Sequence, residues 1–212
     1  MLKQFQKITW SVVNFVNPPT KTQRITRNAV VSRVILKEFV EAALVMDNKG
    51  FFAGTLGEVS LRTSGGKFII TPREIPICRL NEESLLSESI KKEIDSKNGD
   101  LPFHVQWHRA IYNNSDANAV VLCQLPWITV LANRMQKPEP DILVDANRLL
   151  AYVDVSELED IELEDTLNEK HSLFIRSIGL LAWGQSMNDL IDRIEILERL
   201  SEISARERLI HQ

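Results

Sequence analysis

The sequence has little cysteine, no excess of positive charge and no long uninterrupted apolar run. Its two cysteines, Cys78 and Cys123, lie far apart in apolar stretches, so we expect buried thiols rather than a disulfide or a metal-binding pair. With 25 Lys and Arg against 29 Asp and Glu, the net charge is −4, which argues against a nucleic-acid partner. The apolar run at residues 8–16 is interrupted by Ser11 and Asn14 and is too short to span a membrane. We therefore expect a cytoplasmic protein with neither a nucleic-acid nor a membrane partner.

The composition is that of one globular domain with a short appendage. Hydrophobic residues make up 44% and charged residues 25% of the 212 positions, which is enough apolar material for a substantial core. The run Asn17-Pro18-Pro19-Thr20 breaks any regular element near the N-terminus. We expect residues 1–26 to form an N-terminal appendage and residues 27–212 to form the domain.

Helical and strand-like patterns alternate along the domain. Apolar residues at near-helical spacing predict a helix at 25–46, ended by Gly50. Alternating residues around a Ser-Gly-Gly turn at 64–66 predict a β-hairpin over 54–71. The remaining elements are expected as a strand at 75–80, a helix or a strand at 85–94, a helix at 102–112, a strand at 119–123, a helix at 126–135, a strand at 149–155, and paired strands at 173–175 and 180–183.

The last third of the chain contains an acidic run and a clear helix start. Residues 158–167 are rich in Asp and Glu, and we interpret them as the solvated face of a helix rather than a cation site. Ser186 is predicted to cap the final helix, with Asp189 in the acidic position of a capping box.

The stretch around residues 119–123 is the centre of the predicted fold. Its apolar, partly β-branched residues predict a buried strand, and Pro126 marks the start of the next helix. A strand that runs into a helix is a common place for chemistry. Here the junction holds Leu122, Cys123 and Gln124, none of which is a strong acid, a strong base or a ligand for hard metals.

Four short motifs occur in order along the domain. They are Gly57-Glu58-Val59-Ser60-Leu61-Arg62, Phe68-Ile69-Ile70-Thr71-Pro72, His108-Arg109-Ala110-Ile111-Tyr112 followed by Asp116-Ala117-Asn118-Ala119-Val120-Val121, and Ile178-Gly179-Leu180-Leu181-Ala182-Trp183-Gly184. Together they resemble the motifs of the class II aldolase/adducin head family over residues 28–210. The resemblance implies a three-layer α/β/α sandwich around a mostly antiparallel central sheet, assembled as a homotetramer with active sites between subunits.

Enzymes of that family hold a zinc-like divalent ion with three histidines, and the ion polarises an enediolate while a glutamate moves a proton. By resemblance, Leu122 and Gln124 occupy the positions of a His-x-His pair, and Ile178 occupies the third histidine position. His104 stands at the glutamate position and Glu58 at that of a phosphate-binding asparagine. Hydrocarbon side chains cannot ligate a metal, and an amide oxygen is a weak zinc ligand. The resemblance therefore implies the fold without the family's metal site, and no cofactor is expected.

Two histidines at helical spacing offer an alternative metal site. His104 and His108 are four residues apart on the expected helix, and Cys123 lies on a strand expected to pack nearby. A rebuilt zinc-like site would use His104, His108 and Cys123, with His171 as a further candidate. His104 is also the candidate catalytic residue, as the base that would activate Cys123 as a nucleophile. The structural alternative is that His108 and Cys123 are core residues and that His104 is a polar replacement at a disused site.

Ser60 and Arg73 are the candidate substrate-binding residues. By resemblance, Ser60 occupies the serine of a Gly-Asn-x-Ser-x-Arg motif, whereas Arg73 and Glu74 replace small residues expected after Thr-Pro. Arg73 beside Arg62 would suit an anion. The alternative is a surface ion pair of Arg73 with Glu58 or Glu74.

Two functions are compatible with this sequence. The first is a protein that has lost metal-dependent aldolase or epimerase chemistry and acts as an oligomeric binding or scaffolding module, as the adducin head does within the family. The alternative is an aldehyde-lyase or epimerase that acts on a sugar-derived carbonyl substrate through a divalent metal held around His104 and His108. Metal analysis of the purified protein separates the two.

Overall fold

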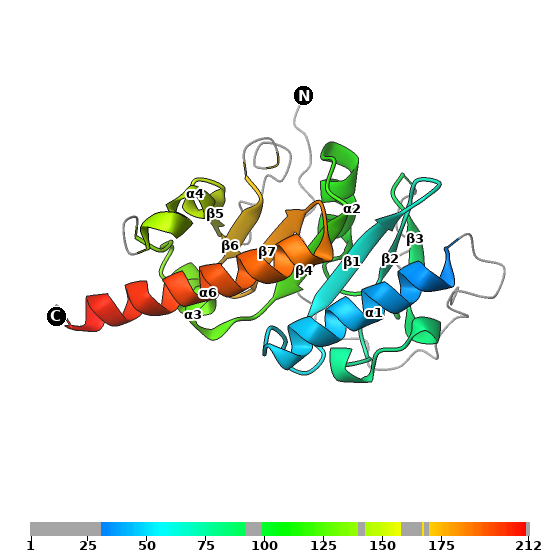
Figure 1. Ribbon diagram of the computed structural model, residues 1–212, viewed down its shortest axis with the longest axis horizontal. Coiled ribbons are helices and arrows are strands. Elements are labelled where there is room, and N and C mark those ends of the chain that lie inside the picture. The colour runs from blue at the N-terminus through cyan, green and yellow to red at the C-terminus, as the bar shows by residue number, and fades with distance from the viewer. Residues whose placement is uncertain (1–30, 92–98, 140–142, 158–166, 168–169, 211–212) are drawn as a thin grey trace, which may run out of the picture.

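A seven-stranded sheet forms the middle layer of the domain in the computed structural model (Figure 1). The structure describes residues 31–91, 99–139, 143–157, 167 and 170–210. The spatial order of the strands is β3-β2-β1-β4-β7-β6-β5, and every pair is antiparallel except β5 and β6. The strands are β1 (Glu58–Thr63), β2 (Lys67–Ile70), β3 (Leu86–Ser89), β4 (Ala119–Cys123), β5 (Val153–Ser156), β6 (Ser172–Ile175) and β7 (Gly179–Gly184).

Helices cover both faces of this sheet. The helices are α1 (Arg33–Asn48), α2 (Val105–Asn114), α3 (Pro126–Asn133), α4 (Asn147–Leu150) and α6 (Met187–Ile210), with short 3-10 turns η1 (Ile77–Arg79), η2 (Glu82–Ser84) and η3 (Val144–Ala146). Apolar residues of α1, α3 and α6 share one core with one face of the sheet, and those of α2 share a second core with the other face. This confirms the expected three-layer α/β/α sandwich around a mostly antiparallel sheet.

The central strand β4 explains why the run at 119–123 is apolar throughout. Ala119, Val121 and Cys123 belong to the core beneath α1, α3 and α6, whereas Val120 and Leu122 belong to the core beneath α2. Side chains alternate between the two faces of a strand, so a strand covered on both sides needs apolar residues at every position. The expected buried strand is confirmed.

The first helix starts later than its apolar pattern predicts. Residues 25–30 lie outside the described part of the chain, and α1 begins at Arg33, where the Ser32 side chain accepts a hydrogen bond from the Val34 N–H at 3.2 Å. The helix ends at Asn48, and Gly50 follows with a φ of 78°. The serine cap therefore sets the start, and the expected glycine follows the end.

The predicted hairpin is confirmed as β1 and β2, with Thr63 opposite Lys67 across the turn. Gly65 and Gly66 both adopt positive φ, at 73° and 67°, as a tight hairpin turn requires. The strand expected at 75–80 is wrong, because this segment forms the 3-10 turn η1. It begins after Pro76, which has no N–H to donate to a neighbouring strand. Residues 85–94 were expected to form either a helix or a strand, and the structure has the strand β3 in this segment, paired with β2.

The later elements agree with the predictions in type and differ at their ends. The strand expected at 149–155 begins only at Val153, because residues 147–150 form α4. Ser186 caps α6 by accepting from the Asp189 N–H at 3.1 Å, as predicted. The Asp189 carboxylate binds Arg193 at 2.9 Å. The acidic residues 158–166 and the appendage at 1–26 lie outside the described residues.

The long helix α6 crosses the sheet on the face that it shares with α1 (Figure 1). Glu195 on α6 forms an ion pair with Lys49 at the end of α1, at 2.7 Å. Glu198, one turn further, accepts the Trp127 and Ile128 N–H groups at the start of α3, each at 3.0 Å. One helix thus connects elements from both halves of the chain.

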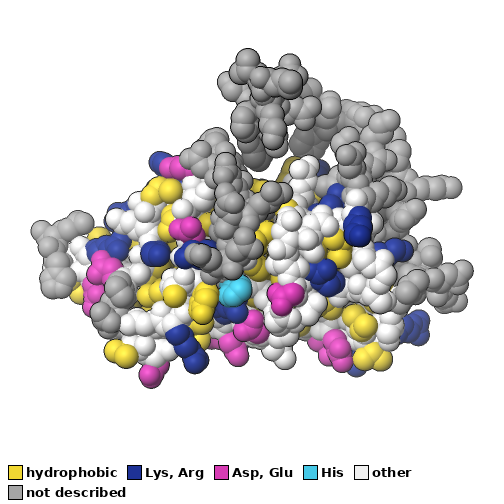
Figure 2. All heavy atoms as spheres, turned by 90° about the horizontal axis from the view of Figure 1, so that it is seen from above, with side chains coloured by type: hydrophobic (Ala, Val, Ile, Leu, Met, Phe, Trp, Pro, Cys, Tyr) yellow, Lys and Arg dark blue, Asp and Glu magenta, His cyan; other side chains and the backbone are white. Residues whose placement is uncertain are grey.

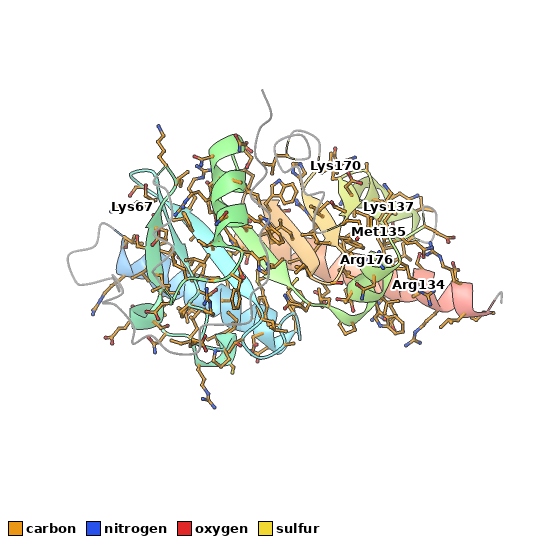
Figure 3. All side chains as sticks on the ribbon, turned by 180° about the vertical axis from the view of Figure 1, so that it is seen from behind. Lys67, Arg134, Met135, Lys137, Lys170 and Arg176 are labelled. Atoms are coloured by element: carbon orange, nitrogen blue, oxygen red, sulfur yellow. The ribbon has the colours of Figure 1, made fainter. Side chains whose placement is uncertain are left out.

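The surface carries both signs of charge. Acidic and basic side chains are interspersed among the described residues on the face in Figure 2. Lys67 at the start of β2 and Lys170 just before β6 lie on opposite sides of the molecule in Figure 3, as the strand order requires. No described helix is both long and apolar enough to cross a membrane.

Candidate functional site

The positions that the family resemblance assigns to metal ligands come together at one end of the central strands. β1 and β4 pair with Glu58 opposite Leu122, so these side chains lie on the same face, toward α2. Gln124 follows two residues after Leu122. Ile178 packs against the core beneath α2, and the next residue, Gly179, approaches the Gln124 backbone so closely that an added Cβ would lie 3.3 Å from the Gln124 Cα.

The Glu58 carboxylate is the centre of a polar cluster at this end. It is 4% exposed, and its Oε1 accepts hydrogen bonds from the His104 backbone N–H at 3.1 Å and from His104 Nδ1 at 2.8 Å. Its Oε2 lies 3.4 Å from His108 Nε2, at ion-pair distance. Burial alone would raise the pKa of Glu58, but the contacts with the two histidines lower that pKa to about 2. The buried carboxylate is therefore ionised at neutral pH.

His108 continues the cluster into the core. Its Nδ1 lies 2.7 Å from Ser60 Oγ, which in turn lies 2.7 Å from the Tyr112 hydroxyl. With a proton on Nε2 facing Glu58, Nδ1 accepts from the Ser60 hydroxyl, and Ser60 accepts from Tyr112. Burial raises the pKa of Tyr112 above its ordinary value, so this hydroxyl keeps its proton. The result is a connected chain of side chains between β1 and α2.

His104 lies at the outer end of the same cluster. It occupies the N-cap position of α2, its side chain is 19% exposed, and its ring stacks on Trp107 with centroids 4.4 Å apart. Because Nδ1 donates to Glu58, the imidazole is held in one orientation with Nε2 as the remaining nitrogen. A histidine oriented by a carboxylate in this way can accept or donate a proton at Nε2.

The two candidate substrate-binding residues lie in different environments. Ser60 is fully buried between His108 and Tyr112, so it belongs to the core rather than to an open surface. The Arg73 guanidinium lies over the ring of Phe103, 3.9 Å from the centroid. Phe103 precedes α2 in the chain and is 65% exposed.

The expected proximity of Arg73 to Arg62 is wrong. Arg62 donates to the backbone oxygens of Tyr112, Ser115 and Ala117, at the C-terminal end of α2, whereas Arg73 contacts Phe103 before its N-terminal end. Arg62 therefore serves to hold the end of α2 against β1. The expected ion pair of Arg73 with Glu58 is also not formed, because Glu58 binds the two histidines.

Cys123 does not join the histidines. It belongs to the core beneath α1, α3 and α6, while His104 and His108 lie on α2 across the sheet. Burial, together with the nearby Glu198 carboxylate, raises the pKa of the Cys123 thiol far above its ordinary value. Hence the proposed trio of His104, His108 and Cys123 is not a single site, and Cys123 is not activated by His104. His171 is also elsewhere, with its ring stacked on Tyr152 at 5.2 Å.

The residues at this end of the sheet do not fit a divalent ion. Leu122 is fully buried among apolar neighbours, and Ile178 adds further hydrocarbon. Gln124 offers only an amide oxygen, which is buried and has no hydrogen-bond partner. Across the described ranges, no group of three or more His, Cys, Asp or Glu side chains could hold a metal ion.

Sequence reasoning missed the central role of Glu58 and the contribution of Tyr112. From the sequence, Glu58 stood out only at the position of a phosphate-binding asparagine and as an alternative ion-pair partner of Arg73, and Tyr112 only as part of a motif. The signal that would have found them is that Glu58, His104 and His108 all fall within or beside the matched motifs. A buried carboxylate on β1 needs compensation from the facing helix. His104 provides two hydrogen bonds to Oε1, and His108 Nε2 lies 3.4 Å from Oε2, at ion-pair distance without a hydrogen bond.

Known proteins similar to this chain agree with the fold. The family model for the Class II Aldolase and Adducin N-terminal domain matches residues 37–205. Methylthioribulose-1-phosphate dehydratase of Methylococcus capsulatus is 25% identical over 190 residues, which cover 80% of this chain and 92% of that protein.

Two solved structures give the same result. L-fuculose-1-phosphate aldolase from Thermus thermophilus superposes with a TM-score of 0.74 at 22% identity, covering 85% of this chain and 100% of that one. A sugar-phosphate aldolase from Thermotoga maritima gives a TM-score of 0.62 at 17% identity, covering 85% and 97%. Because the family model spans most of the domain, this chain belongs to the class II aldolase and adducin N-terminal domain family.

Proposed function

We propose that this protein keeps the class II aldolase fold without the metal-dependent carbonyl chemistry of the family and acts as a binding module in a homo-oligomer. The observation that carries the proposal is the set of side chains at the three ligand positions. Leu122 and Ile178 are hydrocarbon, and Gln124 is a neutral amide. An enediolate intermediate would lack the cation that stabilises it in the metal-dependent reaction.

The negative charge of Glu58 also supports the proposal that this protein does not bind a phosphorylated sugar substrate. The named relatives act on phosphorylated sugar derivatives. In this chain the resemblance puts Glu58 where a phosphate-binding asparagine would stand, and that carboxylate is ionised and buried. Like charges repel strongly where water is scarce, so a phosphate at this position would be disfavoured.

The proposal of an oligomer rests on the surface around the cluster as well as on the family. Phe103 and Leu56 are large, exposed apolar side chains close in sequence to His104 and Glu58. Exposed apolar groups around a buried polar cluster suit a contact with a second subunit. Light scattering of the full chain checks this part, and a monomer at micromolar concentration would refute it.

The test of lost chemistry is metal content together with turnover. Untagged protein is analysed for zinc, manganese and iron, and assayed for retro-aldol cleavage of L-fuculose 1-phosphate and for dehydration of methylthioribulose 1-phosphate. We expect no stoichiometric metal and no metal-dependent turnover. As a matched control, the combined variant Leu122→His, Gln124→His and Ile178→His should acquire metal if the positions are correctly assigned. Stoichiometric metal in the unmodified chain, removed by chelator together with activity, would overturn the proposal.

A second candidate is an enzyme that moves a proton without a metal. The specific observation in its favour is the 2.8 Å hydrogen bond from His104 Nδ1 to Glu58, which orients a partly exposed imidazole. The similar proteins named above, a dehydratase and aldolases, are enzymes, which also favours this candidate. Turnover that resists chelator and disappears in His104→Ala would establish this candidate. The metal-dependent alternative loses Cys123, which lies across the sheet from His104 and His108, and the Glu58 carboxylate between the two histidines is paired with their nitrogens.

A further inference from the structure

The contact between β1 and α2 is polar from one end of the helix to the other. Alternate residues of a strand point to the same face, and the residues of β1 that face α2 are Glu58, Ser60 and Arg62. Residues four apart on a helix lie on one side of it, and the residues of α2 that meet β1 are His104, His108 and Tyr112. We call these six residues the polar seam.

The two ends of the polar seam carry opposite charges. At the start of α2, the Glu58 carboxylate accepts from the His104 backbone N–H at 3.1 Å. At the other end, the Arg62 guanidinium donates to the backbone oxygens of Tyr112, Ser115 and Ala117, at 2.8, 3.0 and 2.8 Å. A helix dipole is positive at its start and negative at its end, so each charge lies at the end that it stabilises. The polar seam therefore fits one direction of α2 along β1 and not the reverse.

The repeat distances of the strand and the helix also match. Two residues of a strand advance about 6.6 Å, and four residues of an α-helix advance about 6 Å. Ser60 Oγ lies 2.7 Å from both His108 Nδ1 and the Tyr112 hydroxyl, between the contacts made by Glu58 and those made by Arg62. A displacement of α2 by one turn, about 5.4 Å, would break the contacts of all three β1 residues at once.

The apolar contacts beside the polar seam are less selective. Val105 and Ile111 of α2 share a core with Ile70 and Val120 of the sheet. The hydrophobic effect is non-directional, so such contacts are favourable wherever apolar surface is covered. A buried polar group, in contrast, is costly unless its partner lies within hydrogen-bond distance. The polar seam therefore sets the axial position of α2 more sharply than the apolar core does.

We propose that the polar seam fixes the direction and axial position of α2 on the sheet, and that Arg62 is a positioning residue for His104 at the opposite end of the helix. Arg62 acts through α2, whose 10 residues span about 15 Å. A shift of α2 along β1 moves His104 away from the Glu58 carboxylate. This inference concerns the placement of His104, so it goes beyond the proposed function and holds whether or not the protein is an enzyme.

The test follows backbone amide exchange by NMR in the ¹⁵N-labelled full chain. The reporter is the His104 N–H, which Glu58 protects. In Arg62→Met we expect this exchange to become roughly tenfold faster or more, because three backbone oxygens lose a charged donor and α2 is released from its position. Arg62→Lys keeps the charge but not the forked donor, so it should accelerate the exchange less. The amides of α1, which packs on the other face of the sheet, should keep their wild-type rates.

Arg79→Met is the matched control, because Arg79 is exposed in η1, whose Ile77 shares its core with α1. This variant should leave the His104 exchange rate unchanged. If His104 keeps its wild-type rate in both Arg62 variants and only amides beyond residue 111 exchange faster, Arg62 is a local cap and the proposal is overturned. It is overturned equally if the amides of α1 and α2 accelerate alike, which indicates general destabilisation, or if the Arg79 control matches Arg62→Met.

Discussion

Replacing Glu58 by glutamine is the sharpest test of the polar cluster, because it removes the charge and keeps the shape. The Glu58 carboxylate is almost fully buried and is held in its ionised form by His104 and His108. Glutamine resembles the protonated form of this side chain. The difference in unfolding free energy between the two proteins should therefore follow the ionisation of Glu58.

The size of the effect follows from the pKa of Glu58, which falls from 4.5 to about 2 on folding. A depressed carboxyl pKa adds stability above the unfolded value and loses it as the pH falls toward the folded value. A shift of about 2.5 units at ~1.4 kcal/mol per unit gives about 3 kcal/mol at neutral pH. By about pH 3 the same relation leaves less than half of it.

Urea unfolding of the two proteins at a series of pH values measures this difference. We expect Glu58→Gln to be less stable by about 3 kcal/mol near pH 7, with the two curves converging as the solution is acidified. Glu74→Gln serves as the control, since Glu74 is exposed and lies outside the cluster. A difference that does not change with pH, or one equal to that of the control, would show that the carboxylate is not ionised and bound as described.

Three further predictions test other parts of the structure. Gly179→Ala should lose roughly 3 kcal/mol of stability, measured by thermal unfolding, because Gly179 has a φ of 121° and an added Cβ would lie 2.4 Å from the Cys123 backbone oxygen; full stability would contradict this geometry. Only Cys78, which is exposed, should react with a thiol reagent in the native protein, whereas buried Cys123 should react after unfolding; rapid modification of both would contradict the buried position. Glu198→Ala should cost about 1–2 kcal/mol, because Glu198 caps α3 from α6; a chemical-denaturation midpoint equal to that of the wild type would show that the cap contributes nothing.

Local sequence patterns were sufficient to predict those elements whose conformation is determined by their own residues. The strand at 119–123 is apolar at every position, and the hairpin at 64–66 has glycines where positive φ is needed, so both could be predicted. The segment 75–80 has a strand-like composition, yet it forms no ladder and contains Pro76. The choice at 85–94 depended on pairing with β2, which no local pattern contains.

The candidate site shows the same limit more clearly. Glu58 and His104 are 46 residues apart, and only the facing of β1 and α2 brings them together. The error with Cys123, however, could have been avoided, because Leu122 and Cys123 are neighbours on one strand and must point to opposite faces. Motif matching grouped Glu58, His104 and Leu122, which do lie at one end of the sheet, and side-chain alternation decides which strand residues face α2 there.

The position of α6 also has a consequence for how the chain matures during translation. Lys49 near the start of the domain and the first turn of α3 both depend on partners in this helix. It is the last described element to leave the ribosome. Until it emerges, the face of the sheet that it covers, together with the apolar sides of α1 and α3, is exposed to solvent. A nascent chain stalled before α6 should therefore bind chaperones, whereas release of the final helix should let the domain close.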